Sequence, residues 1–133
     1  MKARVLIVED NEEILKLERV LFETEGAEVV GAINGDDGVL AMQTSINEKR
    51  PFDLVVLDIR LPAISGFYVA RHMRDIGYKG LIAAFTANAT GEGKAEGEES
   101  GIDLYFSKTV LNTKLARALL EQATGVESTT PTT

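Results

Sequence analysis

Short apolar runs alternate with longer amphipathic segments along most of the chain. Most runs are apolar over four or five consecutive residues, which is typical of strands buried on both faces of a sheet. Between the runs, apolar residues recur every three or four positions, which predicts helices. Strands are expected at 5–8, 27–31, 54–57, 81–85 and 102–106, and helices at 11–25, 39–49, 67–75 and 115–122. This alternation predicts an α/β fold in which helices cover both faces of a parallel sheet.

Two details of these elements can be compared directly with a structure. The first helix is expected to turn one apolar stripe towards the core, formed by Ile14, Leu15, Leu17, Leu21 and Phe22. Residues 34–38, Asn-Gly-Asp-Asp-Gly, are rich in turn-forming residues and are expected to form a turn before the second helix.

Residues 91–101 depart from the pattern, because they hold glycines and glutamates but no large apolar side chain before Ile102. Each interior glycine costs a helix about 1 kcal/mol relative to alanine. The fourth helix is therefore expected to be short, frayed or mobile. Residues 124–133 are rich in serine and threonine and are expected to be a disordered tail, which leaves 1–123 as one domain.

Composition narrows the possible functions. The net charge of -7 disfavours direct binding to nucleic acid or to anionic membranes. Without cysteine, the chain has no disulfides, thiolate catalysis or cysteine-bound metals. No apolar run approaches the roughly 20 residues that span a bilayer. The N-terminus becomes acidic at Glu9, too early for a signal peptide. We therefore expect a cytoplasmic protein.

Polar side chains follow the predicted strands, at the edge where parallel sheets bind ligands. Glu9 and Asp10 follow the first strand, Asp58 the third, Thr86 the fourth, and Lys108 lies just beyond the fifth. Mg²⁺ suits such a carboxylate cluster, because it binds one or two carboxylates and shares phosphate oxygens. An aspartate can attack a phosphoryl group to form an acyl phosphate, while Mg²⁺ and a lysine neutralise the developing charge. The pattern predicts a divalent-cation site beside a phosphoryl acceptor.

Four motifs carry a family resemblance. They are Val-Leu-Ile-Val-Glu-Asp-Asn at 5–11, Leu-Asp-Ile-Arg-Leu-Pro at 57–62 with Gly66, Phe-Thr-Ala-Asn-Ala at 85–89, and Tyr-Phe-Ser-Lys at 105–108. Over about residues 4–121 the chain resembles the receiver domain of two-component response regulators. The stretch from Thr86 through Tyr105 is most similar to receivers attached to hybrid sensor kinases. The resemblance implies a flavodoxin-like, doubly wound, five-stranded parallel sheet with strand order 2-1-3-4-5. It also implies a signalling module rather than an enzyme.

The resemblance implies a role for each residue at the cluster. Asp58 would be the phosphoacceptor. Mg²⁺ would be held by Glu9, Asp10 and Asp58 and by the backbone carbonyl of Arg60. Lys108 would pair with the phosphoryl group. The phosphoryl donor would be a histidine of a sensor kinase or a phosphotransfer domain, and the output would pass to a downstream protein.

The same resemblance implies a switch. Thr86 would hydrogen-bond the phosphoryl group, and Tyr105 would turn inward as Thr86 moves. The side chains of Arg60 and Asn88 lie where members of the family tune the lifetime of the acyl phosphate.

One residue departs from the family pattern. Members usually have a cis Lys-Pro bond after the fifth strand, whereas this chain has Lys108-Thr109. A cis bond that does not precede proline costs about 2.5–4 kcal/mol. We therefore expect a trans bond and a locally rearranged loop.

Two alternatives remain open at the level of sequence. A Mg²⁺-dependent aspartyl phosphatase of the haloacid-dehalogenase type would use similar chemistry, but such enzymes carry a second aspartate where this chain has Arg60. A receiver-like module that binds protein and is never phosphorylated is the other alternative. Thr109 and the glycine-rich fourth helix are compatible with it.

Overall fold

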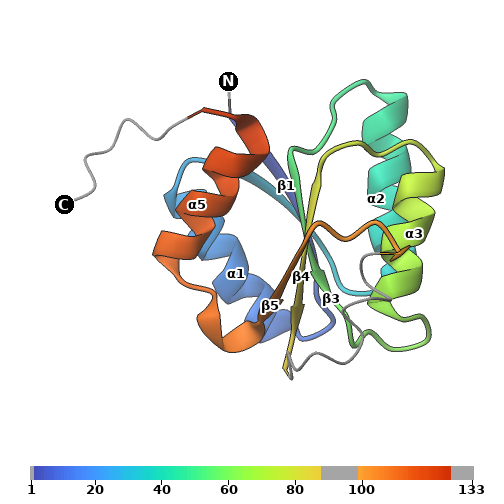
Figure 1. Ribbon diagram of the computed structural model, residues 1–133, viewed down its shortest axis with the longest axis horizontal. Helices are drawn as coiled ribbons and strands as arrows, with labels where there is room; N and C mark the ends of the chain where they lie inside the picture. Colours follow the sequence, from blue (N-terminus) through green and yellow to red (C-terminus); the bar gives the residue numbers. More distant parts are fainter. Residues whose placement is uncertain (1, 88–98, 127–133) are drawn as a thin grey trace.

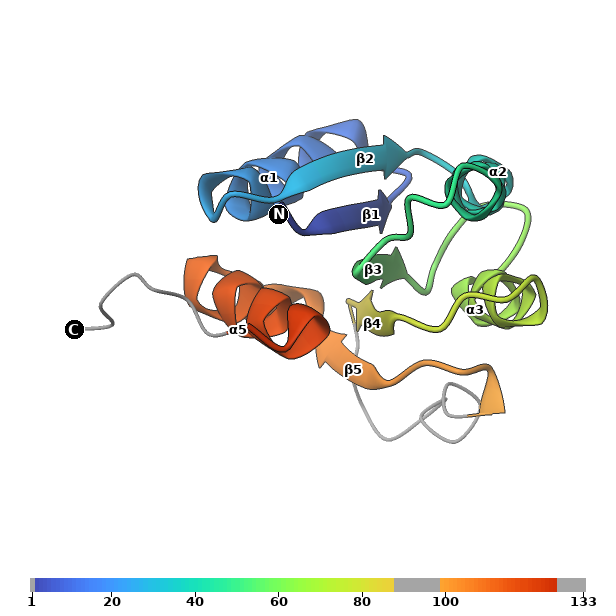
Figure 2. The same ribbon diagram turned by 90° about the horizontal axis from the view of Figure 1, so that it is seen from above.

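Among the residues that the structure describes, five parallel strands form one sheet with two helices on each face (Figures 1 and 2). The computed structural model describes residues 2–87 and 99–126. The strands are β1 (Arg4–Val8), β2 (Glu28–Ala32), β3 (Leu54–Asp58), β4 (Leu81–Thr86) and β5 (Leu104–Ser107). The helices are α1 (Glu12–Thr24), α2 (Gly35–Asn47), α3 (Gly66–Asp75) and α5 (Thr113–Thr124), with a 3-10 turn η1 (Lys108–Val110). The strand order β2-β1-β3-β4-β5 confirms the predicted fold.

Strand register brings the carboxyl ends of the central strands to one edge. Val8 lies opposite Leu57 across β1 and β3, and Asp58 lies opposite Phe85 across β3 and β4. In the last pair, Thr86 lies opposite Ser107, next to Lys108 in the chain. The polar residues that end or follow these strands therefore meet at one edge.

Two apolar layers hold the sheet between the helices. Leu6 and Val8 of β1 pack into the layer under α2 and α3, whereas Val5 and Ile7 pack into the layer under α1 and α5. We call the layer under α1 and α5 the α1–α5 layer. All four side chains are fully buried. Burying one such side chain contributes about 1.5–3 kcal/mol, so the alternation of β1 between the two layers stabilises both faces.

The second helix begins earlier than expected, so the predicted turn at 34–38 is wrong. Asn34 is the N-cap, and its side-chain oxygen accepts a hydrogen bond from the Asp37 amide. Such a cap supplies an acceptor for an amide of the first turn, which has no partner within the helix. Gly38 then lies inside α2, where an added Cβ would be only 2.8 Å from Val8. The glycine at 38 allows α2 to approach β1 closely.

The apolar stripe of α1 also differs from expectation. Leu15, Glu18 and Phe22 are buried, whereas Leu17 is 67% exposed. Positions 15, 18 and 22 follow the helical period and face the sheet, while position 17 falls on the opposite side. The expectation from apolar residues alone was therefore wrong for Leu17, which is exposed, and it missed Glu18, which is buried.

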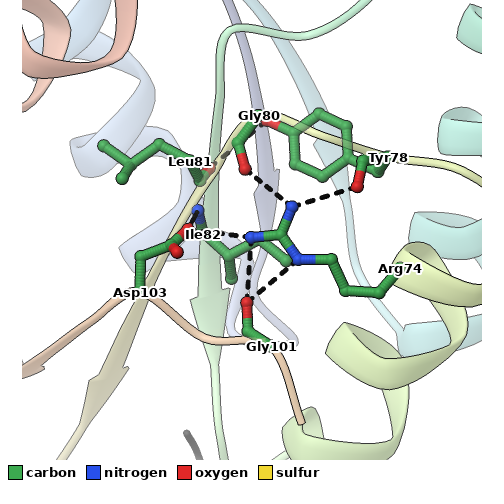
Figure 3. Close-up of polar contacts among 7 residues, drawn as sticks. All are labelled: Arg74, Tyr78, Gly80, Leu81, Ile82, Gly101 and Asp103. Atoms are coloured by element: carbon green, nitrogen blue, oxygen red, sulfur yellow. Dashed lines mark hydrogen bonds and ion pairs between the residues drawn. The ribbon is translucent and has the colours of Figure 1, made fainter.

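Arg74 joins three segments at the other end of the sheet (Figure 3). Its guanidinium group donates hydrogen bonds to four residues: the carbonyls of Tyr78, Gly80 and Gly101 and the carboxylate of Asp103. The same Asp103 oxygen accepts from the Ile82 amide at 2.8 Å. We call this set of contacts the Arg74 clamp. β5 begins at Leu104 rather than at the predicted residue 102, directly after the clamp residue Asp103.

The remaining element boundaries agree with the sequence to within a few residues. Helix α5 ends at Thr124 rather than at 122, so Thr124 belongs to the helix and not to the predicted tail. Residues 88–98 and 127–133 contain most of the predicted frayed helix and of the predicted tail, and they lie outside the described residues.

Candidate functional site

Three carboxylates form a cluster at the carboxyl edge of the sheet. Glu9 follows β1, Asp10 comes next, and Asp58 ends β3. One oxygen from each of these side chains lies within 4.8 Å of the others. Glu9 and Asp58 are buried and Asp10 is exposed, so the cluster is reached from the Asp10 side. Clustered carboxylate oxygens are ligands for a hard divalent cation such as Mg²⁺.

Lys108 places a positive charge between two of these carboxylates. Its Nζ atom lies 2.7 Å from Oε1 of Glu9 and 3.0 Å from Oδ2 of Asp58. Partial burial opposes the charged form of Lys108, but its hydrogen bonds to the two carboxylates outweigh burial and raise its pKa. Burial raises the pKa of Glu9, and the hydrogen bond from Lys108 opposes that rise. The ammonium is therefore a firmly charged counter-ion of the cluster.

Backbone amides hold the remaining oxygen atoms of the two buried carboxylates. The Arg60 amide donates to Oδ1 of Asp58 at 3.0 Å, and the Asn11 amide donates to Oε2 of Glu9 at 3.1 Å. Each carboxylate is thus bound on one oxygen by Lys108 and on the other by an amide. These contacts restrict rotation of both side chains and keep them aimed at the same point.

The start of α3 is packed directly against Asp58. The Gly66 amide donates to the Ile59 carbonyl at 2.9 Å. A Cβ atom at residue 66 would lie 2.5 Å from the Asp58 carbonyl oxygen, closer than atoms can approach. Glycine is therefore required at this position, and the absence of a side chain lets α3 support the strand end that carries Asp58.

The loop after β5 has the predicted trans geometry. The described residues contain no cis peptide bond, so Lys108-Thr109 is trans. The chain instead forms the 3-10 turn η1, and the Ser107 hydroxyl accepts from the Thr109 amide at 3.3 Å and shares a 2.9 Å hydrogen bond with the Thr109 hydroxyl. This rearranged turn leaves Lys108 within reach of Asp58.

The two residues expected to form the switch lie on the paired strands β4 and β5. Thr86 is buried at the end of β4. Tyr105 is half-buried in β5, lies opposite Ala84 in register, and packs against the layer under α2 and α3. The side chain of Arg60 is exposed, and Asn88 lies outside the described residues.

Sequence reasoning missed one charged residue near the cluster. Glu18 is buried on the sheet-facing side of α1, and burial raises its pKa to about 8. Its position between Leu15 and Phe22 at helical spacing is a signal that could have indicated burial.

The comparisons with known proteins agree with this geometry. The model of the response regulator receiver domain family matches residues 5–120. The chain belongs to the response regulator receiver domain family.

Relatives of this receiver include a stand-alone regulator and longer proteins. It is 35% identical to the polar-differentiation response regulator DivK of Brucella anthropi, over 83% of this chain and 87% of that protein. It is 36% identical to a probable transcriptional regulatory protein of Picosynechococcus sp., over 96% of this chain but only 53% of that protein. The chain thus spans about half the length of that curated relative.

Solved receivers share the same fold. A CheY-like response regulator receiver domain protein from Methanospirillum hungatei superimposes with a TM-score of 0.82 and 26% identity, covering 94% of this chain and 96% of that one. The receiver domain of sensor histidine kinase PA1611 from Pseudomonas aeruginosa, solved with a magnesium ion in its active-site cleft, has a TM-score of 0.80 at 23% identity and covers 95% of this chain and 100% of that one.

Membership defines the class of function. Receiver domains are signalling modules of two-component systems, and they interact with histidine kinases. This chain is therefore not a classical enzyme such as an aspartyl phosphatase. Among the helices of residues 2–87 and 99–126, none has the length and apolar character needed to cross a membrane.

Proposed function

We propose that this receiver accepts a phosphoryl group on Asp58 from a phosphohistidine of a sensor kinase or phosphotransfer domain. The observation that carries the proposal is the convergence of Glu9, Asp10 and Lys108 on Asp58. An oxygen of Asp58 attacks phosphorus, and the phosphorus–nitrogen bond to the histidine breaks. The imidazole leaves with the bonding electrons and takes up a proton, so the products are an acyl phosphate and a neutral histidine.

The donor atoms fit Mg²⁺. Glu9, Asp10 and Asp58 supply carboxylate oxygens, and the backbone carbonyl of Arg60 would supply a further one. When bound, the ion supplies positive charge next to the transferring oxygens. The magnesium in the PA1611 receiver supports the same assignment here.

Lys108 has the complementary task. In the resting receiver its ammonium is shared between Glu9 and Asp58. Once a cation neutralises these carboxylates, the ammonium is available to pair with the phosphoryl oxygens on Asp58. It would stabilise the charge that spreads over those oxygens during transfer.

The signal would leave the site through β4 and β5. We assign Thr86 to bind a phosphoryl oxygen through its hydroxyl, and Tyr105 to move further inward as Thr86 shifts. Support comes from their places on adjacent paired strands, two residues apart in register. The phosphoryl group would thereby bias a two-state equilibrium and alter a surface that a downstream protein reads. Arg60 and Asn88 would tune hydrolysis of the acyl phosphate.

We further propose that residues 1–123 are the functional unit and that it acts in the cytoplasm. The family match to residues 5–120 and the cysteine-free composition support this.

Intact-mass spectrometry tests the proposed function. Incubation with acetyl phosphate and Mg²⁺ should add about 80 Da, the mass of one phosphoryl group. Asp58→Asn should remove the adduct, whereas Asp75→Asn, a change at an exposed residue of α3, should retain it. Chelation of Mg²⁺ should also suppress it. A wild-type protein that binds Mg²⁺ yet never acquires the adduct would contradict the proposal and favour a binding module.

A further inference from the structure

Glu18 lies in an apolar environment. Helix α1 buries Leu15, Glu18 and Phe22 along one face, and Glu18 is only 6% exposed. Leu15 and Phe22, one turn away on either side, both belong to the α1–α5 layer. On the α5 side this layer is formed by Ala116 and Leu119. A carboxyl group is thus placed on the buried face of α1, between two side chains of this apolar layer.

One oxygen of the carboxyl group lacks a hydrogen-bond partner in this position. Oε1 of Glu18 is the one buried side-chain nitrogen or oxygen atom without such a partner within residues 2–87 and 99–126. An ionised carboxylate that loses water without gaining donors is costly, and a neutral carboxyl is much less so.

The charges around Glu18 do not reverse this preference. Burial is the main cause of its raised pKa, and negative Glu9 and Asp58 add to the rise, while Lys108 opposes it. Lys108 is already shared between the other two carboxylates. Its pKa of about 8 leaves Glu18 mostly protonated at neutral pH.

Other charged groups on the surrounding elements have their own contacts. On α5, Arg117 pairs with Glu25. On β2, Glu28 pairs with Arg4. On α1 itself, Arg19 donates to the Val29 carbonyl at 2.9 Å. The described residues therefore offer no donor that holds Glu18 in its charged form.

We propose that Glu18 is a proton-binding site that controls the packing of the α1–α5 layer. With the proton bound, the carboxyl group tolerates its apolar surroundings and α1 stays packed against the sheet. When the proton is lost, the carboxylate requires water, and α1 must move away from the layer to admit it. The proposal does not depend on phosphorylation of Asp58.

The two helices that form the α1–α5 layer are joined in the chain to residues of the functional site. Helix α1 begins two residues after Asp10, and α5 follows the turn that carries Lys108. Loosening the α1–α5 layer therefore moves elements joined to both sides of the carboxylate cluster. The receiver would be compact below the midpoint of the Glu18 titration and looser above it.

Carboxyl-carbon NMR of metal-free, ¹³C-labelled receiver tests the proposal directly. Glu18→Gln identifies the Glu18 signal by removing it. In the wild type this signal should titrate with a midpoint near 8. Methyl signals of Leu15 and Leu119 should shift with the same midpoint. A Glu18 midpoint near the ordinary value of 4.5 overturns the proton site. A midpoint near 8 with unmoved methyl signals overturns its control of packing.

Thermal unfolding provides an independent measurement. The unfolded carboxyl loses its proton near pH 4.5 and the folded one near 8, so wild-type stability should fall as pH rises between these values. Glu18→Gln and Glu18→Leu should each flatten this fall, because neither side chain ionises. Glu23→Gln removes an exposed charge from the same helix and should leave the fall unchanged. A fall of equal size in both Glu18 variants would overturn the proposal.

Discussion

The ammonium of Lys108 lies 3.0 Å from Oδ2 of Asp58, although the two residues are 50 positions apart in the chain. Asp58 ends β3 and Lys108 follows β5, with β4 between these strands. The lysine therefore reaches across the end of β4 to the carboxylate. The trans turn that follows β5 is compatible with this contact, so the usual cis proline is not required for it.

Removal of the Lys108 charge should have opposite effects on two measurements. In Lys108→Met, isothermal titration calorimetry should show tighter Mg²⁺ binding, because no ammonium competes for Glu9 and Asp58. Phosphorylation by acetyl phosphate should slow by about 100-fold, because the transferring oxygens lose a stabilising charge. Lys108→Arg keeps the charge and should lose less. An unchanged phosphorylation rate in Lys108→Met would contradict the role proposed for the ammonium.

Gly66→Ala should disturb Asp58 without changing any charge. The added Cβ would meet the Asp58 carbonyl oxygen at 2.5 Å and the Ile59 Cα atom at 2.7 Å, and both belong to backbone. We expect a loss of about 1–3 kcal/mol in the free energy of unfolding, measured by denaturant titration, and slower phosphorylation. Arg71→Ala at an exposed position of α3 is the control. Wild-type stability and rate in Gly66→Ala would show that α3 does not constrain Asp58.

The Arg74 clamp should depend on the shape of the guanidinium group as well as on its charge. Arg74→Lys keeps the charge but cannot reach the carbonyls of Gly80 and Gly101 together with Asp103. Denaturant unfolding should show a loss of about 3 kcal/mol, since several charged hydrogen bonds disappear. The same change at exposed Arg71 should cost little. Equal stabilities of the two variants would show that the clamp contributes nothing.

The ion pair between the C-cap of α1 and helix α5 should respond to acid. Arg117 donates two hydrogen bonds to Glu25, at 2.7 and 3.2 Å, and these bonds lower the Glu25 pKa. A lowered carboxyl pKa stabilises the folded state above the unfolded value of 4.5 and loses that effect as pH falls through the folded value. Glu25→Gln should therefore melt below the wild type at about pH 7 and close to it at about pH 3.

This acid response has the opposite sign to that of Glu18. Lowering the pH weakens the pair formed by Glu25 but favours neutral Glu18. If the melting difference between wild type and Glu25→Gln stays constant down to low pH, the ion pair does not supply it. The carboxyl groups of Glu18 in α1 and of Glu25 at its C-cap thus provide internal controls for each other.

The fold was predictable because its main signals are local. Apolar runs such as 54–57 are typical of strands buried on both faces, and a parallel sheet then brings their carboxyl ends to one edge. That reasoning was enough to predict from the sequence that Asp58, Glu9 and Lys108 lie close together. The start of α2 was missed because Asn34 and Gly35 favour a turn and a helix cap alike, and only packing against β1 decides between them.

Other features depend on contacts that no local pattern encodes. The sharing of Lys108 between two carboxylates requires the register of three strands. The Arg74 clamp joins residues as far apart as 74 and 103. The spacing of Glu18 from Leu15 and Phe22 indicates the buried face of α1, although glutamate is typical of a surface. Its proximity to the carboxylate cluster comes only from the tertiary fold.

The shared ammonium of Lys108 has a consequence for the metal-free protein. Three acidic groups held this close would repel one another and strain the edge of the sheet, but the chain brings its own neutralising cation to two of them. The receiver is therefore expected to keep its native shape in a chelating buffer, unlike small zinc domains that unfold when the ion is withdrawn. If Asp58 is phosphorylated as proposed, a chelator is expected to prevent that phosphorylation without unfolding the domain.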